Sequence, residues 1–213
     1  MAIQTHLVKA LFPVEVARAV STRGKSTFAA EYAETQLLLI SVQEGGEVLA
    51  GLSSATEEGG AVAPARRLDY HTEALDKASV ASLLASARRS DADRAQLVRD
   101  RLSRGKHFVV ALRKRASADR ISPDRVSVGR AMNSDIVLRD GSVSKLQAWF
   151  ELRDDREFAV ADAGSTNRTA VNGEQLLPRK LRYLAEGDVI ELGAVSTMIC
   201  SAETLWAAIH DSA

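Results

Sequence analysis

The spacing of apolar residues changes character near residue 105. Before that point, the stretches 6–20 and 72–104 carry apolar side chains at helical spacing. After it, short apolar runs alternate with polar turns such as Asp140-Gly141 and Asn172-Gly173. The change predicts a mostly helical N-terminal domain over residues 1–104, of unknown function, and a β-rich domain over residues 105–213.

Several short helices are expected in the N-terminal part. Residues 6–20 suggest one or two helical pieces, and residues 27–34 continue the helical pattern. Within 72–104, Ser90 is placed to cap a second helix and Gly105 is placed to end it. The arginines between residues 88 and 104 alternate with aspartates, which is typical of a solvated helix face, with nucleic-acid contact as the alternative.

One segment of the N-terminal part has a β-like pattern. The apolar run 36–42 is followed by Gly45-Gly46 and by a second apolar run at 47–52. Two such runs around a glycine pair predict a short β-hairpin, and a buried helix turn is the alternative.

The C-terminal part is expected to be an antiparallel β-sandwich with a short final helix around Trp206. Short strands separated by polar turns at frequent intervals are typical of that architecture. The expected strands are 108–112, 125–129, 135–138, 147–153, 157–162, 169–171, 180–184, 188–192 and 195–200. The fold class is therefore α+β overall.

Charge and composition exclude several classes of function. The 28 Lys and Arg residues balance the 28 Asp and Glu residues, and the two parts of the chain balance separately, so neither part has the basic excess of a nucleic-acid binder. Cys200 is the single cysteine, which rules out an intrachain disulfide and predicts a small buried apolar residue. The first residues do not resemble a signal peptide, and no apolar run is long enough to span a bilayer. We expect a cytoplasmic protein without a membrane partner.

No catalytic motif emerges from the sequence. Gly24-Lys25-Ser26 lacks the earlier glycine of a phosphate-binding loop, because Ala19 stands at that position. His6 and His71 have no recognisable metal-ligand or catalytic-triad spacing. We therefore expect no enzyme activity, no metal and no cofactor.

The turns between residues 128 and 173 carry groups suited to an anion. Arg130 follows a strand, and its planar guanidinium can bind two oxygens of a phosphate. Ser144 and Lys145 precede the next strand, and Thr166 and Asn167 lie in the turn after Asp162. Because a sandwich collects its turns at its two ends, these residues can converge on one ligand.

Residues from about 106 to 210 resemble a forkhead-associated (FHA) domain. The matching residues are Gly129-Arg130, Ser134-Asp135-Ile136-Val137-Leu138, Val143-Ser144-Lys145, Asp162, Ser165-Thr166-Asn167, Thr169, Val171-Asn172-Gly173, Gly187-Asp188-Val189-Ile190 and Leu192-Gly193. The resemblance implies a β-sandwich that reads phosphothreonine in partner proteins. It also implies that Arg130 and Ser144 bind the phosphate, with Lys145 and Thr166 close to it. By the same resemblance Asn167 holds the peptide backbone, while Gly129, Asn172 and Gly173 support the site.

Two residues depart from the family pattern. Gln147 stands where the family usually has histidine, and its amide can both donate and accept hydrogen bonds in place of that ring. Arg168 stands where the family usually has glycine. Glycine in such a turn tolerates positive φ and leaves room for a peptide, so an arginine there either strains the turn, obstructs the peptide or adds a cation for an acidic or doubly phosphorylated peptide.

The main hypothesis is a phosphothreonine-binding adaptor in Ser/Thr kinase signalling. Its partner would be a kinase or a kinase substrate, and self-association is an open alternative. A second hypothesis is a phosphate-independent interaction or oligomerisation module with a degenerate site. A third places an enzymatic or DNA-binding activity in residues 1–104.

Overall fold

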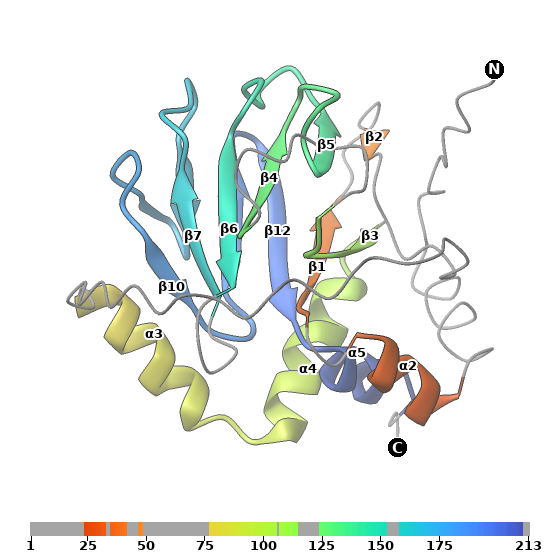
Figure 1. Cartoon of the computed structure of the whole chain (residues 1–213). Coiled ribbons are helices and arrows are strands. Elements are labelled where there is room, and N and C mark those ends of the chain that lie inside the picture. The colour runs from red at the N-terminus through yellow and green to blue at the C-terminus, as the bar shows by residue number, and fades with distance from the viewer. Residues whose placement is uncertain are drawn as a thin grey trace, which may run out of the picture.

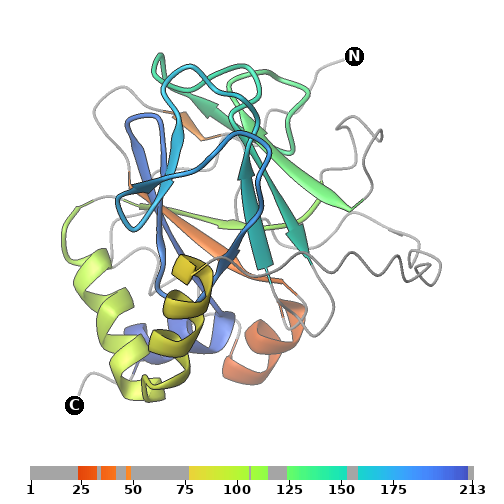
Figure 2. The same cartoon turned by 90° about the vertical axis from the view of Figure 1, so that its left-hand side faces the viewer.

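The chain folds as two β-sheets with helices gathered at one end of the sandwich, in both views of the computed structural model (Figures 1 and 2). The structure describes residues 24–32, 35–41, 47–48, 77–105, 107–114, 124–152 and 158–210. The helices are α2 (Lys25–Glu31), α3 (Lys77–Ala87), α4 (Asp91–Leu102) and α5 (Ala202–His210). The α+β class predicted from the sequence is confirmed.

Each sheet has six strands. In spatial order, the first sheet contains β3 (His107–Ala111), β1 (Leu37–Ser41), β12 (Val195–Cys200), β11 (Val189–Leu192), β8 (Thr169–Val171) and β9 (Glu174–Gln175). The second contains β10 (Arg182–Leu184), β7 (Phe158–Asp162), β6 (Ala148–Leu152), β4 (Arg125–Gly129), β5 (Ile136–Arg139) and β2 (Glu47–Val48). Pairing is antiparallel except between β4 and β5, which run parallel.

Strand β1 lies in the middle of the first sheet, although it comes from the N-terminal part of the chain. It pairs with β3 on one side and β12 on the other, with Leu38 opposite both Val110 and Ile199. Leu38 and Ile40 enter the core between the sheets. Leu37 and Leu39 point the other way, into an apolar layer formed with the helices. Because both faces of β1 are buried, its sequence is a continuous apolar run.

The helical layer packs on the outer face of β1, β3 and β12 in the first sheet. It contains Phe28 from α2, Tyr32 directly after α2, Val98 from α4 and Trp206 from α5. The ring of Phe28 lies 5.1 Å from that of Tyr32 and 6.0 Å from that of Trp206, centroid to centroid. Cys200 is buried in this layer, as expected, and burial raises the pKa of its thiol well above the usual range.

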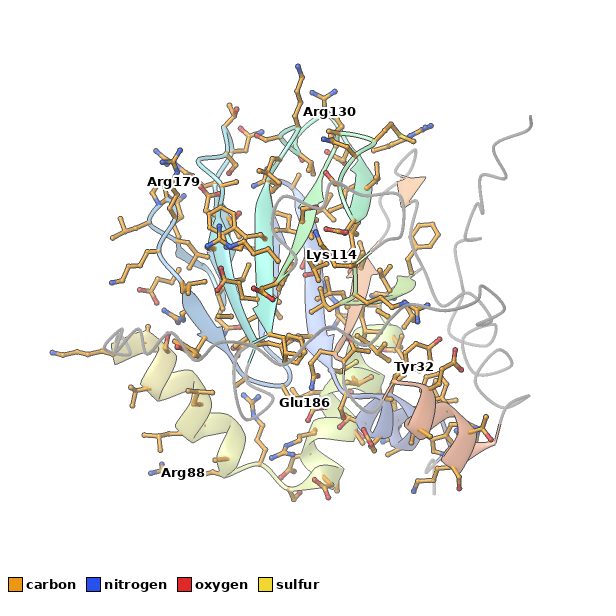
Figure 3. The ribbon with its side chains drawn as sticks, in the orientation of Figure 1. Tyr32, Arg88, Lys114, Arg130, Arg179 and Glu186 are labelled. Atoms are coloured by element: carbon orange, nitrogen blue, oxygen red, sulfur yellow. The ribbon has the colours of Figure 1, made fainter. Side chains whose placement is uncertain are left out.

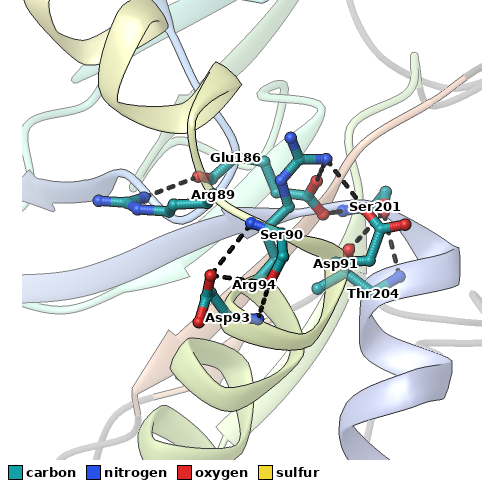
Figure 4. Close-up of polar contacts among 8 residues, drawn as sticks. All are labelled: Arg89, Ser90, Asp91, Asp93, Arg94, Glu186, Ser201 and Thr204. Carbon is teal, nitrogen blue, oxygen red and sulfur yellow. Dashed lines mark hydrogen bonds and ion pairs between the residues drawn. The ribbon is translucent and has the colours of Figure 1, made fainter.

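The start of α4 is fastened to the sandwich (Figure 4). Ser90 caps the helix by accepting a hydrogen bond from the amide of Asp93, whose carboxylate accepts one from the amide of Ser90. Arg94 pairs with the carboxylate of Glu186 at 3.7 Å, and that carboxylate also accepts from the amide of Ser201 at 2.7 Å. Part of the arginine series expected to face solvent therefore docks the helix instead.

Most elements lie where the sequence placed them, with two corrections. The runs at 36–42 and 47–52 contain strands β1 and β2, but they do not form the predicted hairpin, because the two strands belong to different sheets. The sandwich is also not purely antiparallel, since β4 pairs with β5 in parallel. The helical pieces expected at 6–20 lie outside the described residues. The division at residues 104 and 105 stays a prediction, and the first sheet contains strands from both sides of it.

Among the helices that the structure describes, none has the length and hydrophobicity needed to cross a membrane. Within the same residues, no cluster of three histidine, cysteine or carboxylate side chains could hold a metal ion.

Candidate functional site

The loops after β4 and before β6 are joined by main-chain hydrogen bonds. The amide of Arg130 donates to the carbonyl of Ser144 at 2.8 Å, and the amide of Ala131 donates to the carbonyl of Lys145 at 3.0 Å. Gly129 allows this approach, because a Cβ at that position would lie 2.3 Å from the carbonyl oxygen of Lys145. Glycine is therefore needed at residue 129 for a steric reason.

Ser144 also contacts the loop between β7 and β8. Its hydroxyl oxygen accepts a hydrogen bond from the amide of Thr166 at 3.0 Å. The two hydroxyl oxygens are 3.5 Å apart, at the outer limit of a hydrogen bond. Ser144 is half-buried and Thr166 is exposed. Two residues separated by more than twenty positions thus place their hydroxyls side by side.

Arg130, whose amide is bonded to the carbonyl of Ser144, has an exposed side chain at the end of the sandwich away from the helices (Figure 3). Its Nε donates to the carbonyl of Val143 at 3.1 Å, which restricts the orientation of the guanidinium. The terminal nitrogens have no hydrogen-bond partner among the residues described. Lys145 is exposed as well. The arrangement offers donors and positive charge to a ligand outside the protein.

Gln147 joins these loops through its buried side chain. It is fully buried, and its amide oxygen accepts from the amide of Ser144 at 2.9 Å. Its amide nitrogen lies 2.8 Å from the carbonyl of Arg168, 2.9 Å from the hydroxyl of Ser165 and 3.2 Å from the hydroxyl of Thr169. One side chain therefore links the Ser144 loop to both ends of the turn that contains Thr166.

Asp162 shapes that turn. One oxygen of its buried carboxylate accepts from the amides of Gly164 and Ser165, at 2.8 and 3.0 Å. The other oxygen accepts from the hydroxyls of Ser165 and Thr169. The run Asp162-Ala163-Gly164-Ser165 contains residue types that favour such a turn, although the hydrogen bonds of Asp162 were not predicted from them.

Asn167 and Arg168 occupy the far end of the same turn. The amide nitrogen of Asn167 donates to the carbonyl of Ser142 at 2.8 Å. Ser142, which was not among the predicted site residues, also accepts from the amide of Ala194 through its hydroxyl. Arg168 is exposed and has a positive φ of 64°, with its carbonyl bound by the amide of Gly193. The turn is thus tied to two further loops.

A buried aspartate supports the loop between β4 and β5. The carboxylate of Asp135 accepts from the amide and the hydroxyl of Ser127, at 2.7 and 2.6 Å, and from the ammonium of Lys114 at 3.0 Å. These contacts fix the residues that follow Arg130.

Asn172 and Gly173 lie apart from the other predicted residues, at the opposite end of β8 from Arg168. The side chain of Asn172 bonds to the carboxylate of Asp188 and to the amide of Val189, both at 2.9 Å. It therefore braces the start of β11, and its described contacts do not include the phosphate-suited loops.

The fold and the loops define a β-sandwich with an anion-suited end. Residues 126–193 match the family model of the FHA domain, so this part of the chain is an FHA domain. The resemblance inferred from the sequence is confirmed over these residues.

Curated relatives share this region. An oxoglutarate dehydrogenase inhibitor from Corynebacterium efficiens is 38% identical over 96 residues, which cover 44% of this chain and 65% of the relative. The glycogen accumulation regulator GarA from Mycobacterium tuberculosis is 45% identical over 67 residues, covering 32% of this chain and 39% of the relative. The chain thus spans less than two thirds of these relatives. Among solved structures, the FHA domain of the CT664 protein from Chlamydia trachomatis is 27% identical, covering 36% of this chain and 75% of that chain, with a TM-score of 0.34.

Proposed function

We propose that the loop end of this FHA domain binds phosphothreonine in a partner protein and that the chain is an adaptor in Ser/Thr kinase signalling. The observation that carries the proposal is that hydrogen bonds to Ser144 bring Arg130 and Thr166 together, both of them exposed. These residues offer a guanidinium, two hydroxyls and a nearby ammonium, the combination that a phosphate dianion requires.

Each group has a role that follows from its contacts. The Nε of Arg130 is hydrogen-bonded to the main chain, which restricts the orientation of the guanidinium. Its two terminal nitrogens can therefore bind phosphate oxygens. The hydroxyl proton of Ser144 has only a weak partner at 3.5 Å, and it can turn to a phosphate at little cost. Lys145 adds charge, and Thr166 adds a second hydroxyl.

Asn167 is suited to hold the peptide beside the phosphate. Its amide nitrogen is bound to Ser142, which fixes the orientation of the side chain. Its amide oxygen has no partner among the described residues and is available to accept from a peptide N–H.

The proposal is one of binding rather than turnover. The two described histidines are occupied elsewhere: His107 contacts Ser41 and Gly105, and His210 stacks on Trp206. Neither is placed to act as a general base beside Ser144 or Thr166.

Gln147 favours a working site over a degenerate one. Its amide accepts a hydrogen bond from Ser144 and donates one to Arg168. The two loops therefore stay joined although glutamine replaces the usual histidine. The proposed partner is a Ser/Thr kinase or one of its substrates in the cytoplasm. Self-association through a phosphorylated copy of the chain is compatible with the same chemistry.

The test uses the full chain and a phosphothreonine peptide library, followed by fluorescence anisotropy on the selected peptide and its unphosphorylated form. Arg130→Ala removes two charge-assisted hydrogen bonds of about 1.5–3 kcal/mol each, so we expect affinity to fall by roughly 100-fold or more. Arg88→Ala is the matched control, because Arg88 is exposed at the helical end of the molecule (Figure 3). Equal binding of the two peptide forms would refute the proposal.

A further inference from the structure

Two arginines near the proposed site have an unfavourable backbone conformation. Arg168 and Arg179 both have a φ of 64°. Among the described residues, the other non-glycine residue with positive φ is Asn172, whose short polar side chain is tolerated in that region. Arginine has no such advantage, so glycine or asparagine would fit either position with less strain.

The main chain holds both arginines in place. The carbonyl of Arg168 accepts from the side chain of Gln147 at 2.8 Å and from the amide of Gly193 at 3.2 Å. Arg179 follows Pro178 in a tight turn closed by a hydrogen bond from the amide of Lys180 to the carbonyl of Leu177. Proline followed by a residue with positive φ is the arrangement of a type II turn.

The two arginines lie on neighbouring loops. The amide of Arg179 donates to the main-chain carbonyl of Asp162 at 2.8 Å. The carboxylate of the same aspartate holds Gly164 and Ser165, in the turn that ends at Arg168. Figure 3 shows Arg179 on the part of the sandwich away from the helices, as is Arg130.

Neither side chain has a role inside the protein that the structure reveals. Both are exposed, and neither makes a hydrogen bond or ion pair with any residue that the structure describes. A side chain without such a contact, at a position that glycine fits better, adds nothing to folding that glycine would not supply. An external ligand gives both cations a function.

The charge of this end of the sandwich supports a ligand with more than one anionic group. Residues 130–145, 163–168 and 176–181 contain six Lys and Arg residues but two Asp residues, in a chain with no net charge. One of those aspartates, Asp135, is already engaged by Lys114. The loops therefore present an excess of cations beyond those proposed to bind the phosphothreonine.

We propose that Arg168, with Arg179 on the neighbouring loop, forms a second anion-recognition point that selects phosphothreonine peptides carrying a further acidic or phosphorylated side chain. This inference rests on the proposed function and specifies its ligand. An extended peptide advances about 3.3 Å per residue, so a side chain a few residues from the phosphothreonine reaches the neighbouring loop.

The experiment measures the binding of four kinds of peptide to the full chain by fluorescence anisotropy. The first has phosphothreonine with neutral flanks, the second adds one glutamate at successive flanking positions, and the third adds a second phosphate. The fourth carries glutamate but no phosphate. We expect the chain to prefer the best doubly anionic peptide over the neutral-flanked one by about tenfold, a difference that corresponds to roughly 1.4 kcal/mol. The second-phosphate and glutamate arms distinguish the two sources of negative charge. The preference should shrink as salt is raised, because the contact is exposed.

Arg168→Gly and Arg179→Gly test the residues directly, with Arg88→Ala as control. We expect Arg168→Gly to bring the preference ratio close to one and Arg179→Gly to reduce it, while Arg88→Ala leaves it unchanged. Both glycine variants should melt at or above the temperature of the parent chain, because glycine accepts positive φ.

The outcomes separate this inference from the proposed function. Phosphate-dependent binding that is lost in Arg130→Ala, together with a preference ratio that Arg168→Gly leaves unchanged, overturns the second anion point alone. A parent chain that binds no phosphopeptide overturns both. A large fall in melting temperature in both glycine variants overturns the inference by assigning the arginines a structural role.

Discussion

Replacing Gln147 by leucine tests the claim that one buried side chain builds the site. The substitution keeps an apolar side chain of similar size but removes every hydrogen bond of the amide. The hydroxyls of Ser165 and Thr169 keep a partner, because each also donates to the carboxylate of Asp162. The amide of Ser144 loses its hydrogen bond to the side chain of residue 147, and the carbonyl of Arg168 loses one hydrogen bond.

The expected cost follows from that count. A main-chain group left without a partner costs about 1–3 kcal/mol when it is buried, and the half-buried amide of Ser144 is the group that loses its described partner. The carbonyl of Arg168 keeps its hydrogen bond from the amide of Gly193 at 3.2 Å and adds less to the cost. Since whole domains are stable by about 5–15 kcal/mol, the loss is a large fraction of the total.

Two assays check this prediction. Guanidinium unfolding should give a midpoint well below that of the parent chain, with an unchanged slope. Phosphopeptide affinity should fall as well, measured at a temperature where the variant is folded, because Ser144 and Thr166 lose their common support. Gln147→His is the matched control: its ring offers one donor and one acceptor and should retain most of both properties. A leucine variant with parental stability and parental affinity would refute the reasoning.

Three further predictions address the frame of the molecule. Gly129→Ala should lower the free energy of unfolding by about 1–3 kcal/mol in a denaturation curve, since its Cβ would overlap the carbonyl of Lys145. Leu38→Ala should cost about 2–5 kcal/mol in the same assay, whereas Leu84→Ala, at a side chain that is 53% exposed, should cost much less. Burial lowers the pKa of His107, so the unfolded chain binds this proton more tightly than the folded chain, and stability should fall as pH drops below about 6.5 toward the lowered pKa. His107→Gln should show a smaller difference in unfolding midpoint between neutral and mildly acidic pH.

Most strands of the sandwich could be predicted because they have a clear local signal, whereas the two-residue strand β9 was not expected. Apolar runs bounded by glycine, aspartate or asparagine turns placed β4, β6, β7 and β8 within a residue of their observed ends. The helix α4 was marked by its serine cap, and Gly105 follows shortly after its C-cap at Ser103. These signals depend on neighbouring residues only, so a single sequence is sufficient to predict these elements.

The partners of the strands could not be predicted in the same way. The run at 36–42 was expected to pair with its neighbour along the chain, but β1 instead lies between β3 and β12. Its two-sided burial depends on helices that lie far away in the sequence. Pairing over such distances is set by the packing of the whole sheet, which local spacing does not encode.

The candidate site also has one part that the sequence predicted and one part that only the fold shows. Arg130, Ser144, Thr166 and Asn167 were singled out by residue type and by their position in a family pattern. The supporting contacts of Ser142, Asp162 and Gly193 join loops whose approach only the fold reveals. The positive φ of Arg168 was indicated by the family pattern, which usually has glycine at that position.

The most direct test of the phosphothreonine site is an NMR titration of the full chain with a matched pair of peptides, phosphorylated and unphosphorylated. We predict that the phosphorylated peptide shifts the side-chain Nε–H signal of Arg130 and the amide signals of Ser144 and Thr166, and that Arg130→Ala abolishes these changes. The unphosphorylated peptide should leave the three signals in place. Shifts of equal size with both peptides, or shifts confined to the helical end around α3, would contradict the account.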